Sequence, residues 1–416
     1  MNAKKPLLIL AVMAALAACD TDDPNDAETL YEGPIYISNT SSATVTVIDA
    51  KTQTVSRTID LSAEVTGNPN QSHFITVTQN GRYLWVGERQ GSSTGRMLVV
   101  DLEDGDKVVK NFNYGAHIGI HLSHDGKWIF SVAHNKGTVE GVNYNNSINI
   151  YDVENMTHLG KIDHGSAPHV METSPDSKTL WTTNAEGGKV IAYDISALPG
   201  TIPQTPSHEI DIVAQLKEKY PDKFLADSVT LHAFAVHPLG KYLFVGSFHH
   251  GGEAMPGGGD VIVDIDTEQI VARIPGGPHN YDISPDRKYL LSGESDEPDC
   301  EEDEYLHDHG HTDLTGPLVR IIDIDVLNGA AAQTGADVDW SRVKVVNTID
   351  AGALGTGSIN HQAYTPDGKF IYVTTSGLHG MGNGSVLIVR ADTLKLVKKI
   401  EVGKHPHGVV VPGYGR

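Results

Sequence analysis

The stretch His279-Asn-Tyr-Asp-Ile-Ser-Pro-Asp-Arg-Lys288 recurs along this chain in recognisable variants. Each variant opens with a histidine, continues through an apolar run and ends in a turn rich in proline, aspartate, glycine and lysine. Three further copies keep the histidine in the same place, and they span residues 73–82, 169–178 and 232–241. Self-similarity at a spacing of tens of residues is the signature of a repeat architecture, so the repeat decides the fold class.

Two looser copies and one fragment complete the series. The copy before Ser123-His-Asp-Gly-Lys127 carries His117 and His121 out of phase with the others. The copy that ends in Thr365-Pro-Asp-Gly-Lys369 carries His361 out of phase, and the fragment runs from His407 to residue 412. The chain therefore holds six internal units and a partial one.

Each turn is followed by a short aromatic and β-branched run and then by a second run that ends in aspartate. Trp128-Ile-Phe-Ser-Val132 and Ile148-Asn-Ile-Tyr-Asp152 are examples. Short runs of this kind, separated by tight turns, predict strands joined as antiparallel hairpins. With a further strand after the second run, each unit has the four strands of a β-propeller blade.

The two ends of the repeat region complement each other. Residues 34–38, 44–49 and 55–60 supply second, third and fourth strands, whereas residues 407–411 supply only a first strand. Together they predict one composite blade, which makes an all-β, seven-bladed propeller over residues 33–416 and leaves no free inner edge. A β-sandwich, the rival fold, does not explain these ends. Residues 198–227 are an insertion with a predicted helix on the rim.

The phrases Leu180-Trp-Thr-Thr-Asn184 and Ile371-Tyr-Val-Thr-Thr375, together with the Ser-Pro-Asp turns, resemble the YVTN family of seven-bladed propellers. That family is similar to the propellers of nitrous oxide reductase and of the d-type haem domain of nitrite reductase. The resemblance covers residues 34–412, and its motifs specify a fold rather than an activity.

The N-terminus predicts export and lipid anchoring. Residues 1–18 combine two lysines with an apolar core typical of a secretory signal, and Leu16-Ala-Ala-Cys19 resembles a bacterial lipobox with Cys19 as the acylated residue. Residues 19–32 are predicted to be an acidic, flexible tether. These features predict a location in the cell envelope, on the periplasmic side of a Gram-negative membrane, with membrane contact only through the lipid. The protein is expected to be a monomer. The formal net charge of −22 argues against nucleic acid as a partner.

Propeller geometry places the starts of first strands and the ends of second strands at the same mouth of the central channel. Histidines therefore converge there from many blades, with Glu88 and Glu294 beside them. Imidazole suits copper and zinc, so these histidines are predicted ligands of a transition metal ion. The predicted metal ligands are His73, His117, His121, His134, His169, His232, His249, His250, His279, His361, His379 and His407.

Two long loops should overhang the same mouth. Residues 295–313 hold Cys300, His307, His309 and His311 among many carboxylates, and they are interpreted as a capture loop. Residues 248–260 hold His249 and His250. Each histidine also has a purely structural interpretation, in which it bonds a neighbouring blade. His124 and His158 are expected in turns without a function.

Three functions are compatible with this pattern. The first is capture or delivery of copper or zinc. The second is an oxidoreductase, with a metal or a d-type haem in the channel. The third is a non-catalytic scaffold for an envelope protein partner.

The resemblance to nitrous oxide reductase implies copper on His73, His169, His232, His279 and His407, but His117 and His361 depart from that pattern and no second copper domain follows. A haem needs fewer histidines, and no nucleophile and base pair indicates a hydrolase.

Overall fold

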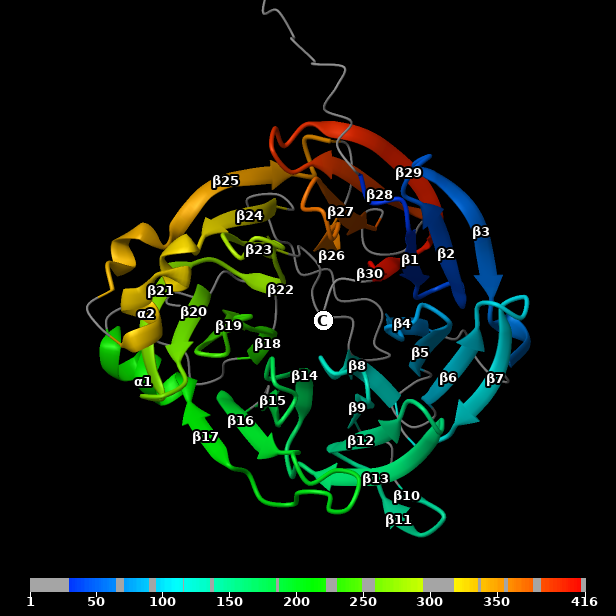
Figure 1. Cartoon of the computed structure of the whole chain (residues 1–416), viewed down its shortest axis with the longest axis horizontal. Helices are drawn as coiled ribbons and strands as arrows, with labels where there is room; N and C mark the ends of the chain where they lie inside the picture. Colours follow the sequence, from blue (N-terminus) through cyan, green and yellow to red (C-terminus); the bar gives the residue numbers. More distant parts are fainter. Residues whose placement is uncertain are drawn as a thin grey trace, which may run out of the picture. The chain divides into compact units, whose positions relative to one another are not determined.

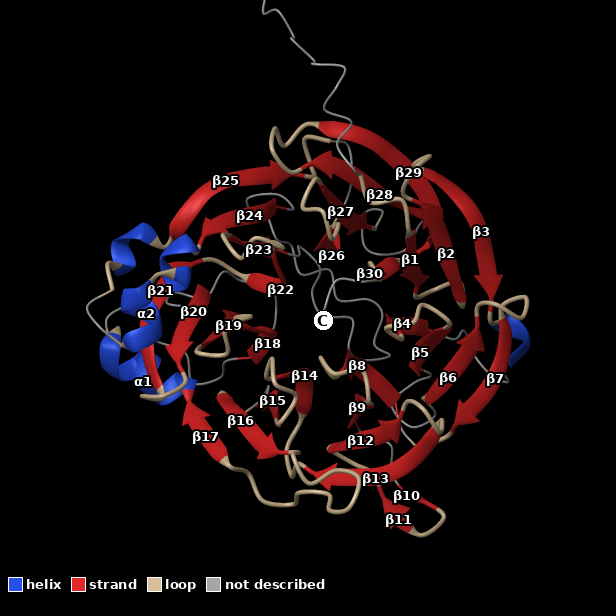
Figure 2. Cartoon of the chain, viewed as in Figure 1, coloured by secondary structure: helices blue, strands red, loops and turns tan. Residues whose placement is uncertain are grey.

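Seven four-stranded antiparallel sheets surround a central channel (Figure 1). The computed structural model describes residues 30–64, 71–89, 95–114, 116–134, 138–184, 187–221, 230–248, 259–294, 318–335, 338–354, 358–376 and 383–412. The predicted seven-bladed β-propeller is confirmed. Strands dominate the described residues, and the few helices lie outside the sheets (Figure 2).

The blades are numbered in chain order from the first complete sheet, and the strands of each blade are given from the channel outward. Blades 1 to 3 consist of β4 (Gln71–Val77), β5 (Tyr83–Arg89), β6 (Arg96–Asp101) and β7 (Lys107–Phe112); β8 (Ala116–Leu122), β9 (Trp128–His134), β12 (Ser147–Asp152) and β13 (Thr157–Asp163); and β14 (Pro168–Thr173), β15 (Thr179–Asn184), β16 (Lys189–Asp194) and β17 (His208–Asp211).

The remaining blades follow the same plan. Blades 4 to 7 consist of β18 (Thr230–Val236), β19 (Tyr242–Phe248), β20 (Gly259–Asp264) and β21 (Gln269–Pro275); β22 (Pro278–Ile283), β23 (Tyr289–Glu294), β24 (Leu318–Asp323) and β25 (Lys344–Asp350); β26 (Ile359–Tyr364), β27 (Phe370–Thr375), β28 (Asn383–Arg390) and β29 (Leu396–Lys404); and β30 (Pro406–Val410), β1 (Pro34–Asn39), β2 (Thr44–Asp49) and β3 (Thr54–Asp60). A small hairpin, β10 (Thr138–Val139) and β11 (Val142–Asn143), projects from blade 2.

Blade 7 closes the ring with strands from both ends of the repeat region, as predicted. In the pairing of β1 with β30, Tyr36 lies opposite Val410 and Ile37 lies opposite Val409. The backbone N–H of Gly408 also donates to the Ser38 hydroxyl at 2.7 Å. Closure thus gives β30, the innermost strand of blade 7, its partner β1 and joins the two ends of the repeat region in one sheet.

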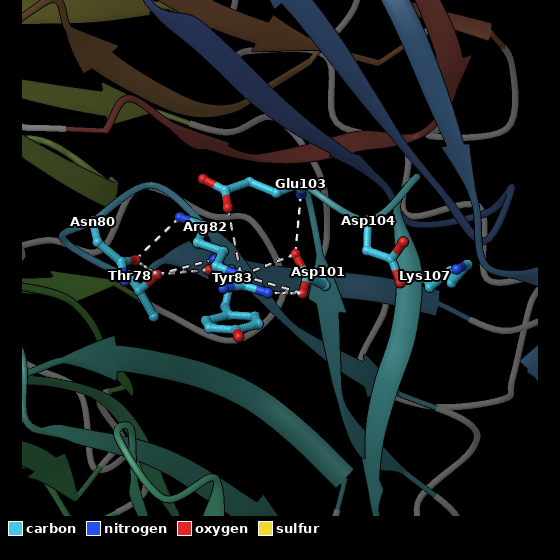
Figure 3. Close-up of polar contacts among 8 residues, drawn as sticks. All are labelled: Thr78, Asn80, Arg82, Tyr83, Asp101, Glu103, Asp104 and Lys107. Atoms are coloured by element: carbon cyan, nitrogen blue, oxygen red, sulfur yellow. Dashed lines mark hydrogen bonds and ion pairs between the residues drawn. The ribbon is translucent and has the colours of Figure 1, made fainter.

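The repeated turn between first and second strands is held by one hydroxyl. In blade 1 the Thr78 hydroxyl accepts the backbone N–H of Tyr83 at 3.0 Å and donates to Asn80 at 2.6 Å (Figure 3). Arg82 then reaches Asp101 at the end of the third strand, at 2.8 Å. The end of the molecule that carries these turns is called the turn face, and the opposite end, where first strands begin, is called the histidine face.

The apolar core lies between neighbouring blades rather than in one centre. Trp181 of blade 3 packs in one cluster with Leu243 of blade 4, and Phe244 of blade 4 packs in another with Tyr281 of blade 5. Each fully buried large side chain stabilises the fold by about 1.5–3 kcal/mol. The blades are therefore rigid supports for whatever their inner strands present to the channel.

The insertion at residues 198–227 differs in part from expectation. It supplies the fourth strand of blade 3, β17, before the helix α1 (Ile212–Lys219) begins. Helix α1 buries Ile212 and Leu216 and bonds to β21 through Gln215, so it lies on the rim as predicted. Short helices α2 (Ala330–Thr334), η1 (Ser62–Glu64), η2 (Asp325–Asn328) and η3 (Trp340–Arg342) complete the described elements.

None of the helices in the described part of the chain combines the length and the apolar character that crossing a membrane requires.

Candidate functional site

Every innermost strand is interrupted by a β-bulge near the place where the repeat carries its histidine. The pairing of β22 with β23 shifts register between Pro278 and Asn280, on either side of His279. Comparable shifts occur in the other six blades. A bulge breaks the ladder locally and re-aims a side chain, so it allows a strand residue to turn into the channel.

Five histidines from five consecutive blades meet in the channel, and they are called the channel histidines: His169, His232, His279, His361 and His407. The His232 ring centre lies 3.9 Å from that of His169 and 4.2 Å from that of His279. On the other side of the cluster, the ring centres of His361 and His407 are 4.5 Å apart. His279 joins the two groups at 6.1 Å from His361 and 6.3 Å from His407. The predicted convergence is therefore seen for these five residues.

A backbone carbonyl sets the tautomer of His232. Its Nδ1 lies 3.0 Å from the carbonyl oxygen of His279, which can only accept a hydrogen bond. In the neutral ring the proton is therefore on Nδ1, and Nε2 carries the lone pair. Ligating histidines usually bond a carbonyl or carboxylate through the other ring nitrogen in this way, because the bond orients the ring.

A polar network holds His361 and His407. The Gln362 amide donates to Asn280 Oδ1 at 3.1 Å, which leaves the Asn280 amide nitrogen to donate to His361 Nδ1. The Thr374 hydroxyl accepts the backbone N–H of His361 at 2.9 Å and lies 2.7 Å from the carbonyl oxygen of His407.

Burial in the channel, and then the nearby His279, His232 and His169 rings, hold the pKa of His361 well below its ordinary value. The His361 ring is therefore neutral at physiological pH.

The spacing of the rings is compatible with a shared ion. Two imidazoles on one Zn²⁺, with Zn–N bonds of about 2.0–2.1 Å at a tetrahedral angle, have ring centres about 5 Å apart. The observed spacings, 3.9 Å to 6.3 Å, lie on both sides of that value. Within the described residues, no group of three or more His, Cys, Asp or Glu side chains is already arranged around one point. Binding an ion therefore requires the rings to change their present orientations.

A cavity of about 460 Å³ extends along the channel from the channel histidines. His232, His279 and His361 line it at one end, and Glu172 and Asp282 line it near the turn face. Apolar side chains such as Ile120 and Phe234 and polar side chains such as Thr76 and Gln362 line the cavity together. The cavity wall thus mixes polar and apolar groups and has titratable side chains at both ends.

A buried ion-pair network supports the strand that carries His279. Arg320 lies 2.7 Å from Asp260 and 2.8 Å from Glu294, and it donates to the carbonyl of Pro275 at 2.6 Å. Glu294 in turn accepts the backbone N–H of Gly277, two residues before His279. A Cβ on Gly276 would lie 2.1 Å from the guanidinium, so this close approach requires glycine there. Arg320 therefore fixes the entry of β22 into the channel.

The structure places the other predicted site residues differently or does not describe them. His121 is buried further along β8, where its Nε2 accepts the backbone N–H of Thr173 at 3.0 Å, so it is not part of the channel-histidine cluster. His73, His117 and His134 lie in β4, β8 and β9, but their side chains are outside the described part. The predicted residues that lie wholly outside the described residues are Cys19, His249, His250, Cys300, His307, His309, His311 and His379.

The structure adds to what the sequence predicted about several polar residues. Glu294 pairs with Arg320, and Glu88 lies 3.7 Å from Arg96, so both carboxylates predicted at the mouth have cationic partners. His158 lies in strand β13 rather than in a turn. Glu172 and Asp282 were not singled out, although both follow a channel histidine by three residues in the repeat, which was the available signal.

Comparisons with known proteins agree with the fold. Residues 34–213, somewhat less than half of the chain, match the family model described as "Lactonase, 7-bladed beta-propeller". The chain has no significant sequence match among curated proteins.

Several solved structures share the architecture. A functionally unknown protein from Desulfotomaculum acetoxidans has a TM-score of 0.62 at 10% identity, over 91% of this chain and 99% of that one. Hydrazine synthase of Kuenenia stuttgartiensis has a TM-score of 0.56 at 19% identity, over 90% and 99%. The dihydro-haem d1 dehydrogenase NirN, in complex with DHE, has a TM-score of 0.52 at 15% identity, over 92% and 75%. At these identities the likeness concerns the fold alone. The chain is a seven-bladed β-propeller, and its residues 34–213 match the lactonase-type seven-bladed propeller family.

Proposed function

We propose that this protein binds a transition metal ion, copper or zinc, at the channel histidines and captures or delivers it. The observation that carries the proposal is the meeting of five imidazoles from five separate blades, with neighbouring ring centres 3.9–4.5 Å apart within each group. Repeat geometry alone requires hydrogen-bonding residues between blades, but it does not require imidazoles stacked on one another in the channel. A set of neutral nitrogen ligands on rigid strands suits a borderline metal ion.

The ligand set favours an ion over a haem. In its neutral form His232 carries its lone pair on Nε2, because Nδ1 donates to the carbonyl of His279. A haem uses only one or two axial ligands, whereas five imidazoles converge here, which is more than a haem needs. A bound Cu²⁺ or Zn²⁺ would polarise its ligands and lock the rings, while Phe74 packs edge-on against His361 and His407 and excludes water from that side.

Changing His232 to alanine tests this function. We expect the full-length protein to bind Zn²⁺ or Cu²⁺ stoichiometrically, and His232→Ala to weaken binding by about 100-fold or more, since ring supports alone are worth 10–100-fold. Isothermal titration with each ion measures the affinity. His208→Ala is the matched control, because His208 is an exposed histidine on the rim, bonded to Glu268.

Three results separate the alternatives. Wild-type protein that takes up neither ion, with an unchanged fold, would contradict metal binding and favour a scaffold for an envelope protein. A haem absorption band in protein purified from its native host would favour the oxidoreductase. A copper absorption band in a metal-loaded sample would distinguish copper from colourless zinc.

We also propose that the propeller is held in the cell envelope by a lipid on Cys19. The support is the order of a charged start, an apolar core and Leu16-Ala-Ala-Cys19 in the sequence. Cys19→Ser is expected to move the protein from the membrane fraction to the soluble fraction of the envelope. Continued sedimentation of Cys19→Ser with membranes would argue against the anchor.

A further inference from the structure

The channel cavity holds a second pair of metal-ligating side chains, away from the channel histidines. His124, in the turn after β8, and Glu172, in β14, both line the cavity near the turn face. The His124 Nε2 and Glu172 Oε1 atoms are 3.9 Å apart, and the two side chains are only 20% and 14% exposed. The sequence interpretation gave His124 no role.

Both side chains are held by their other polar atoms. His124 Nδ1 lies 2.9 Å from the Thr173 hydroxyl, and the backbone N–H of His124 donates to the same hydroxyl at 3.2 Å. Glu172 Oε2 accepts the backbone N–H of Val236, in the next blade, at 2.9 Å. The atoms that face each other, Nε2 and Oε1, are thus presented by side chains whose far ends are fixed. Such fixed outer contacts are typical of metal ligands.

The separation of these two atoms is close to that of two ligands on one zinc ion. A Zn–N bond of about 2.0–2.1 Å and a Zn–O bond of about 2.0–2.2 Å at a tetrahedral angle place the two ligand atoms about 3.3–3.5 Å apart. Zinc binding would therefore bring Nε2 and Oε1 closer than the observed 3.9 Å by about 0.5 Å. The rim pair His208 and Glu268 differs, because its atoms are 2.8 Å apart and bond each other directly.

The surroundings suit a cation that comes from the channel. Asp282 lines the same end of the cavity and adds a second carboxylate, and the Gln79 side chain lies there as well. The same cavity extends to His232 and His279 at its other end. An ion that leaves the channel histidines through the passage would meet this pair before it reaches the turn face.

We propose that His124 and Glu172 form a second, weaker metal position, at which Zn²⁺ binds with water completing its coordination. The proposal rests on the proposed function and extends it, because it makes the channel a path with two positions rather than a single closed site. Two protein ligands bind zinc less tightly than a cluster of imidazoles, so the second position fills after the first.

Zinc titrations of full-length variants test the second position. The starting protein carries Cys300→Ser with His307→Ala, His309→Ala and His311→Ala, so that these side chains bind no zinc. Four variants of this starting protein are then compared. They carry His124→Ala, Glu172→Gln, His208→Ala as the matched control, or the triple change of His169, His232 and His279 to alanine. Glutamine at 172 keeps an oxygen that can accept the Val236 N–H. Calorimetry counts the zinc ions and ranks their affinities, and circular dichroism checks the fold.

We expect two classes of zinc site in the starting protein. His124→Ala and Glu172→Gln should each remove or weaken the lower-affinity class by about tenfold or more and leave the tighter class unchanged, whereas the triple change should do the reverse. If both His124→Ala and Glu172→Gln kept the weaker class of zinc site, the second position would be overturned. It would also be overturned if the control His208→Ala lost the weaker class to the same extent. Absence of the tight class, with a weak class that still depends on His124 and Glu172, would overturn the proposed function and leave the second position standing.

Discussion

Replacing Arg320 by methionine is expected to lower the free energy of unfolding by about 3–5 kcal/mol, because it leaves the buried carboxylate of Asp260 and the partly buried one of Glu294 without their cation. Arg320 is 7% exposed and Asp260 1% exposed, so water cannot take over the role of the guanidinium. The same change frees the Pro275 carbonyl and the Glu294 contact next to β22. Urea denaturation at pH 7.5 measures the loss of stability.

A surface pair provides the control for this result. Arg390 contacts Asp392 at 2.8 Å, but 36% and 58% of these side chains are exposed. Exposed pairs of this kind contribute about 0–1 kcal/mol, so Arg390→Met should have a small effect. Losses of equal size in the two variants would mean that burial does not make the Arg320 network special. If Arg320→Met still folds, its weaker zinc binding would show that this network also positions His279.

Acidification from pH 7.5 to pH 5 is expected to destabilise the propeller through two histidines outside the channel-histidine cluster, the buried His237 and the partly buried His158. Burial, with a smaller effect of Arg287, lowers the pKa of His237 to about 4. Burial also lowers the pKa of His158 to about 4, where this ring stacks on Tyr114 at 3.9 Å between centres. The unfolded chain has histidine pKa values near 6.5, so it binds more protons than the folded state below that pH.

The direction of the change in stability with pH follows from this difference in proton binding. The stabilising contribution of both histidines is complete above about pH 6.5 and is lost progressively as the pH falls towards 4. At pH 5 the loss is about 2 kcal/mol for each residue, at 1.36 kcal/mol for each pH unit below 6.5. Urea denaturation at the two pH values measures it.

His237→Ser isolates one of the two contributions. His237 stands where five other blades have a turn hydroxyl, as at Thr78 and Ser284, so serine restores the common turn. The variant should lose about 2 kcal/mol less than the wild type on acidification. The exposed His208→Ser serves as the control. An acid-induced loss that is the same in His237→Ser and the wild type would show that His237 is not protonated on unfolding.

The repeat allowed the blade count and ring closure to be predicted, because each copy of the repeated sequence indicates where the same strands and turns lie. Complementary strands at the two ends left only one way to complete the last blade, and β30 beside β1 confirms it. The convergence of His169, His232 and His279 was also predictable, since all three occupy the same position in the phrase.

Other parts of the site could not be predicted from a recurring position in the repeat. His361 is one residue out of phase, and it joins the cluster because the bulge in β26 accommodates both Asn360 and His361 before pairing resumes at Gln362. Arg320 reaches Asp260 and Glu294 across strands that are far apart in the sequence. The pairing of His124 with Glu172 joins blade 2 to blade 3. The relative register of neighbouring blades decides such contacts.

By itself the sequence determined that this protein is a closed seven-bladed propeller with one histidine near the start of most inner strands. A period of alternating apolar residues and turns is a local property, so it can be read from the chain directly. Only the tertiary structure decided which histidines share the channel, which carboxylates pair with arginine and which face the cavity. Bulges re-aim side chains, and packing between blades sets their distances, and neither follows from the order of residues within one repeat.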